Sequence, residues 1–103
     1  MLLIVSDPHR RAELATTFKR CGFAVMAMAA PDEAPPSFRG QVVVTDRQFY
    51  TPAWLEQGAA HVVVLDDASP LFIDGGVTRV PHFYTSFRIA EIVLNLGVER
   101  IGD

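Results

Sequence analysis

Three aspartates stand where short apolar runs end in this chain. Asp7, Asp46 and Asp66 each follow a stretch rich in valine, leucine or isoleucine. Carboxylate oxygens are the ligands that Mg²⁺ prefers, so Asp7 and Asp46 are candidates for a weak magnesium site. If the three carboxyls lie close together, we expect a coupled titration in which one of them holds a proton or pairs with an arginine such as Arg47.

The apolar runs predict the elements that would bring these aspartates together. Continuous Val, Ile and Leu runs separated by helix-like stretches are typical of buried parallel strands. Parallel strands end at one edge of a sheet, and open α/β sheets bind their ligands outside that edge. The sequence therefore predicts an acidic pocket at the carboxyl ends of the strands.

Local signals predict the order of the elements along the chain. Five strands are expected at Leu2–Ser6, at Phe23–Ala29, from Gln41, at His61–Leu65 and at Arg79–Tyr84. Helices are expected from the cap Asp7 to a stop at Gly22, over Thr51–Gln57, and over Phe87–Leu96 with Ser86 as the cap. Pro70, Gly75, Gly76 and Pro81 break up residues 68–81, where we expect an extended piece or a loop.

Composition and charge limit the classes of protein to which this chain could belong. A chain of 103 residues, half of them hydrophobic and a fifth charged, predicts one globular domain over residues 1–103. A net charge of −3 with no Lys/Arg run argues against general nucleic-acid binding. No apolar stretch reaches the length of a membrane span and no signal peptide is recognisable, so we expect a cytoplasmic protein. The single cysteine, Cys21, is expected to be a small hydrophobe.

The last predicted helix has more apolar surface than a surface helix needs. Either it packs deeply beneath the end of the chain, or it docks against a partner or a second copy. The candidate interface is formed by Tyr84, Phe87, Ile89, Ile92 and Leu96.

The order of elements and the positions of the acidic residues resemble the receiver domain of two-component response regulators, over essentially the whole chain. In that pattern Ser6-Asp7 holds the place of the acidic pair, Asp46 that of the phosphate acceptor, and Asp66 that of a Ser or Thr. The Lys-Pro-Phe element aligns with Thr85-Ser86-Phe87, and the aromatic switch position falls on His82. The resemblance implies a flavodoxin-like sheet of five parallel strands, with the middle helices shortened or lost.

Two departures from the pattern change its chemistry. Thr85 replaces the lysine that would balance phosphoryl charge, and Asp66 puts a carboxylate where a hydroxyl would meet the phosphate. The resemblance therefore implies a degenerate, or pseudo-, receiver: a non-catalytic interaction module in two-component (phosphorelay) signalling. Its partner would be a histidine kinase, a neighbouring domain or a second copy. The module would either stand alone or be a domain cut from a larger protein such as a hybrid histidine kinase. The alternative is a receiver phosphorylated on Asp46, with Asp7 helping to hold Mg²⁺.

Arginines and aromatic residues suggest an input for such a module. Arginine forks bind phosphate and rings stack on bases, so these side chains could hold a small anionic nucleotide such as a cyclic dinucleotide; the alternative is a solvated rim over the core. The set consists of Arg79, His82, Tyr84, Arg88 and Arg47. No enzyme is expected, because no histidine lies in a motif around a Ser or Cys nucleophile, and His61 is expected to be a buried structural residue.

Overall fold

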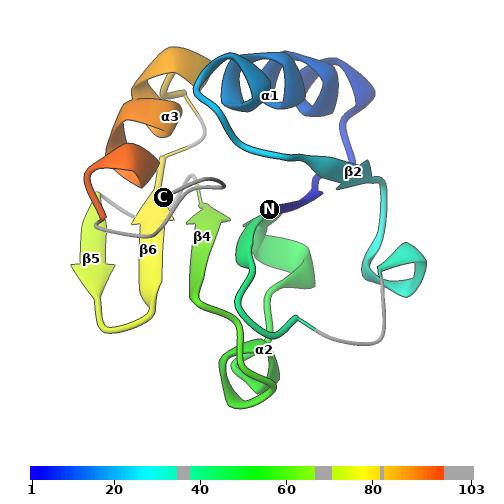
Figure 1. Cartoon of the computed structure of the whole chain (residues 1–103), viewed down its shortest axis with the longest axis vertical. Coiled ribbons are helices and arrows are strands. Elements are labelled where there is room, and N and C mark those ends of the chain that lie inside the picture. Colours follow the sequence, from blue (N-terminus) through cyan, green and yellow to red (C-terminus); the bar gives the residue numbers. More distant parts are fainter. Residues whose placement is uncertain (35–37, 67–70, 82, 97–103) are drawn as a thin grey trace.

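A single six-stranded sheet runs through the protein (Figure 1). The computed structural model describes residues 1–34, 38–66, 71–81 and 83–96. Its strands are β1 (Leu2–Ile4), β2 (Met26–Met28), β3 (Val42–Asp46), β4 (His61–Leu65), β5 (Phe72–Asp74) and β6 (Val77–Val80). The strand order is β2-β1-β3-β4-β6-β5; all neighbours are parallel except β5 and β6.

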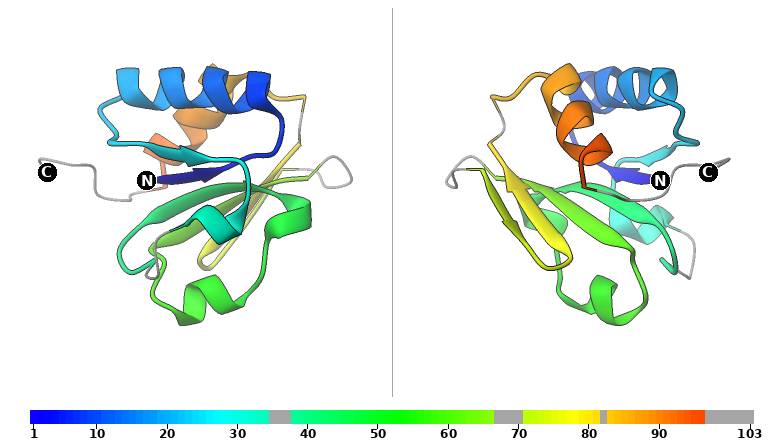
Figure 2. Two further views of the ribbon diagram at one scale, coloured as in Figure 1. Left: turned by 90° about the vertical axis from the view of Figure 1, so that its right-hand side faces the viewer. Right: turned by 60° about the vertical axis from the view of Figure 1, so that its left-hand side comes forward.

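Helices cover the two faces of the sheet unequally (Figure 2). Helices α1 (Pro8–Arg20) and α3 (Ser86–Leu94) pack on one face, where Leu14, Phe18 and Ile89 join the core. The other face carries the short helix α2 (Ala53–Glu56), whose Trp54 packs in a second core cluster. Short 3₁₀ turns at Pro31–Glu33 and Arg47–Phe49 complete the connections.

Strand residues feed both clusters, because successive side chains of a strand point to opposite faces. Along β1, Leu3 packs on the α1 and α3 side, whereas Leu2 and Ile4 pack on the α2 side. The continuous apolar runs are thus explained by burial on both faces. His61 opens β4 as a buried residue with Nε2 2.8 Å from the Thr78 hydroxyl, which confirms its structural role.

The predicted boundaries of α1 are confirmed. The Asp7 carboxylate accepts a hydrogen bond of 3.0 Å from the His9 N–H, and Pro8 occupies the first helical position. Just past the helix, Gly22 adopts φ +94°, a left-handed conformation that favours glycine. Helix α3 begins one residue earlier than predicted, since Thr85 is its cap and accepts from the Arg88 N–H at 3.1 Å.

The prediction of five parallel strands is correct only in part. The five are present, but β5 adds a sixth, antiparallel strand in the segment expected to be extended or a loop. A tight turn at Gly75-Gly76, with Gly75 at φ +53°, joins β5 to β6. As a result β6 begins before Arg79, and it ends at Val80, four residues before the predicted end at Tyr84, because the following Pro81 has no N–H for a ladder. The resulting α/β architecture is compatible with a flavodoxin-like fold.

Two residues of the predicted interface lie in the core. Ile89 is completely buried and Ile92 is 9% exposed, so neither is available to a partner as expected. They fall on the side of α3 that packs against α1 and the sheet, whereas Phe87 points outward. Tyr84 and Leu96 are partly buried against the same core. No helix in the described part of the chain is long and apolar enough to cross a membrane.

Candidate functional site

The three aspartates line one pocket at the carboxyl ends of β1, β3 and β4. Its volume is about 480 Å³. The walls are formed by Ser6, Asp7, Asp46, Arg47, Gln48, Leu65 and Asp66. Because these strands are parallel neighbours, the turns that follow them meet at this edge, as the sequence predicted.

Asp46 is tied to the end of β1. It is the last residue of β3 and only 6% exposed. Its Oδ2 accepts hydrogen bonds from the Ser6 N–H at 2.8 Å and from the Ser6 hydroxyl at 2.9 Å. Burial of a carboxylate is costly unless it is hydrogen-bonded, and these two donors supply that compensation.

Asp66 faces two arginines. The residue is 7% exposed. Its carboxylate oxygen Oδ2 lies 3.3 Å from Arg79 Nη1, and Oδ1 lies 3.9 Å from Arg47 Nη1. The Arg79 guanidinium also lies 5.6 Å from the centre of the Tyr50 ring. The pairing with Arg47 was anticipated, but the cation that Arg79 brings to the rim of the pocket was not.

The structure divides the predicted nucleotide set between two places. Arg79 is paired in register with Val64, so both side chains face the α2 side of the sheet, where Tyr50 packs. Tyr84 packs instead on the side of α1 and α3, and the Arg88 guanidinium lies 5.9 Å from its ring centre. These residues therefore do not form one site as expected. His82 lies outside the described residues.

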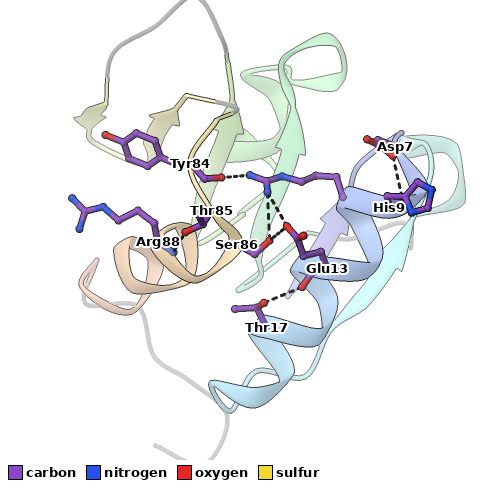
Figure 3. A network of polar contacts seen from close by, with 9 residues as sticks. Asp7, His9, Glu13, Thr17, Tyr84, Thr85, Ser86 and Arg88 are labelled. Atoms are coloured by element: carbon purple, nitrogen blue, oxygen red, sulfur yellow. Dashed lines mark hydrogen bonds and ion pairs between the residues drawn. The ribbon is translucent and has the colours of Figure 1, made fainter.

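A polar network missed by the sequence analysis joins α1 to the start of α3 (Figure 3). Arg10 donates to the Tyr84 carbonyl oxygen and, at 3.0 Å, to Glu13 Oε1. The buried Ser86 hydroxyl donates to the same Glu13 oxygen at 2.5 Å. This hydrogen bond from Ser86 is the main reason why the pKa of Glu13 is lowered, with Arg10 adding to the effect.

Thr85, at the place of the missing lysine, is used within the fold. Its hydroxyl accepts the Arg88 N–H and caps α3, so this position brings no positive charge toward the pocket. A sequence signal for the cap was present, because Thr is a favoured N-cap residue, but Ser86 competes with it one position later.

The hydrogen bonds that the carboxylates of the pocket already accept limit what the pocket could bind. Asp7 and Asp46, the expected magnesium ligands, both accept hydrogen bonds from the protein. Within residues 1–34, 38–66, 71–81 and 83–96, no group of three His, Cys, Asp or Glu side chains is placed to hold a metal ion. Mg²⁺ can be held by one or two carboxylates with water in its other positions, so these two residues remain the ones that would contact it.

Comparison of the chain with protein-family models, curated proteins and solved structures found no significant match. Function must therefore be inferred from the pocket, the strand order and the exposed surface.

Proposed function

We propose that this chain is a pseudo-receiver: a non-catalytic regulatory module that acts through protein contacts in two-component signalling. The observation that carries the proposal is the state of Asp46. The carboxylate at the acceptor position is almost fully buried and held twice by Ser6. Two hydrogen bonds to Oδ2 stabilise the negative charge of this carboxylate and so make it a weaker nucleophile toward a phosphoryl group.

The strand order supports the receiver assignment. Without the edge strand β5, the order β2-β1-β3-β4-β6 is the 2-1-3-4-5 order of flavodoxin-like sheets. Helices α1 and α3 flank one face in the places of the first and last helices of that fold. Strand β5 occupies the chain segment where a receiver has its fourth helix, which leaves β6 and α3 without that cover.

The charges around the pocket support the loss of phosphoryl chemistry. A phosphorylated Asp46 would carry about two negative charges, about one more than the free carboxylate, beside Asp7 and Asp66. Arg79 and Arg47 offset this in part, but both already face Asp66. Loss of one fixed donor to a developing oxyanion costs on the order of 2–4 kcal/mol of transition-state stabilisation, and Thr85 offers no ammonium group in its place.

Regulation would then come through surfaces. The docking face we propose includes β6, Tyr84, Phe87 and the outer side of α3, and it would contact a histidine kinase or a neighbouring domain. Phe87 is 71% exposed, so its ring is accessible to a partner. A cyclic dinucleotide remains a proposed input, with stacking on Tyr84 beside Arg88 as one mode and contact with Arg47 and Arg79 as the other.

Acetyl phosphate and MgCl₂ test the proposal directly. After incubation, intact-mass spectrometry should show the unmodified chain, in both the wild type and an Asp46→Asn control. A stoichiometric phosphoryl adduct in the wild type that is absent from the control would assign acceptor chemistry to Asp46 and overturn the proposal. Asp66→Thr is a useful third protein, because it removes the carboxylate that would repel the phosphoryl group. Any phosphoryl adduct should therefore be more abundant in this variant than in the wild type.

A further inference from the structure

Strand β5 is an exposed, apolar edge of the sheet. Among the described strands it pairs only with β6. Phe72 and Ile73 are consecutive, so their side chains point to opposite faces, yet they are 51% and 57% exposed. Neither face of β5 is therefore well covered by the described elements. Such an edge is a template for pairing with another chain.

Helix α3 lies on the same side of the molecule as β5 (Figure 1). This helix and the loop before it carry further exposed apolar side chains. Phe87 and Leu94 are seven residues apart, which puts them on one face of α3. Phe83 contacts Tyr84 edge-to-face, with ring centres 5.3 Å apart, and is itself largely exposed. The outer side of α3 thus keeps two exposed apolar side chains, Phe87 and Leu94, with the charged Glu91 on the same face.

The exposed area is close to what a dimer would use. With about 200 Å² for a whole large apolar side chain, the exposed parts of these residues amount to on the order of 600 Å². They are Leu71, Phe72, Ile73, Phe83, Phe87 and Leu94. A standard interface buries about 800 Å² per partner, so these side chains would supply more than half of one.

We propose that a second copy of this chain pairs with β5, antiparallel across a two-fold axis, so that one sheet continues through both protomers. A two-fold interface brings the same patch of each protomer together, and an edge strand can pair antiparallel with its own copy. Arg88 Nη1 lies 3.0 Å from Glu91 Oε1, so the charges of these two residues on the outer side of α3 offset each other. The inference rests on the proposed function as a docking module and names one partner for it.

Sedimentation equilibrium of the whole chain, from about 1 µM to about 1 mM, is the test, since this range spans weak and moderate dimers. The mass should rise from 11.3 kDa toward twice that value. Ile73 is the middle residue of β5, so Ile73→Lys would set two ammonium groups opposite each other and weaken the dimer at least about tenfold. Met26→Lys is the matched control, because Met26 is 54% exposed on β2, the opposite edge of the sheet, and it should dimerise like the wild type.

Hydrogen exchange of the wild type gives a readout that needs no variant. The outward amides of residues 72–74 should exchange more slowly at high protein concentration than at low concentration. A mass of 11.3 kDa throughout, equal effects of the two lysine variants, or exchange that is independent of concentration would each overturn the dimer. An Asp46 phosphoryl adduct in a chain that still dimerises would overturn the proposed function and leave the dimer standing.

Discussion

Replacement of Arg79 by methionine should destabilise the protein more than replacement of its partner Asp66 by asparagine. Asp66 is 7% exposed, whereas the Arg79 side chain is 33% exposed. Arg79→Met leaves a buried carboxylate that has lost its nearer arginine. Of the two ion pairs described for Asp66, the longer one remains, at 3.9 Å from Arg47. Asp66→Asn leaves a guanidinium that can turn toward water.

The magnitude follows from this asymmetry. Removal of one partner from a fully buried ion pair costs about 3–5 kcal/mol. Because Arg79 is about one third exposed and Arg47 still faces the carboxylate, we reduce this to about 1–3 kcal/mol for Arg79→Met. For Asp66→Asn we expect about 1 kcal/mol or less, the usual worth of a pair with an exposed cation.

Urea unfolding followed by circular dichroism measures both free energies of unfolding under the same conditions. The double variant completes a mutant cycle, and its cost should fall below the sum of the single costs, because the two residues interact directly. If Asp66→Asn proves the more damaging change, or if Arg79→Met falls within about 0.5 kcal/mol of the wild type, the pairing described here is wrong.

Three further predictions concern other parts of the fold. Burial lowers the pKa of His61, so as the pH falls the imidazole of the unfolded chain is protonated before that of the folded chain. The contribution of this residue to stability is fully present above about pH 6.5 and is lost as the pH falls below that value. Urea titrations at several pH values should therefore show a smaller loss of unfolding free energy at low pH in His61→Gln than in the wild type. Asp7→Ala removes the cap of α1 and should cost about 1 kcal/mol of unfolding free energy; no measurable change would contradict the capping role. Ser86→Ala removes the main cause of the lowered pKa of Glu13, so the NMR titration of the Glu13 carboxyl should shift upward, and an unchanged midpoint would contradict the hydrogen bond.

Local signals were sufficient for the strands β1, β3 and β4 and for the first helix. The apolar runs before Asp7, Asp46 and Asp66 predicted β1, β3 and β4 because parallel strands are buried on both faces. Asp7 with Pro8 at one end and Gly22 at the other predicted α1, since caps act through neighbouring backbone groups. The meeting of the three aspartates then followed from topology.

Features that depend on contacts between residues far apart in the chain could not be predicted from local sequence patterns. Phe72–Asp74 becomes a strand because it can pair with β6, and its own sequence is compatible with a loop. Arg79 and Tyr84 were both placed in the last predicted strand, but they lie on opposite sides of the sheet. The hydrogen bond between Ser86 and Glu13 spans 73 residues, which no local pattern reports.

The central claim is that Asp46 is held within the fold and does not serve as a phosphoryl acceptor. Beryllofluoride, which mimics a phosphoryl group on aspartate, tests it most directly when it is added with MgCl₂ and followed by ¹⁹F NMR and by the amide signals of Ser6, Asp46 and Asp66. If Asp46 is held within the fold, no bound ¹⁹F signal should appear and the amide positions should be unchanged. A saturable ¹⁹F signal, with shifts at Ser6 and Asp46 that disappear in Asp46→Asn, would contradict it.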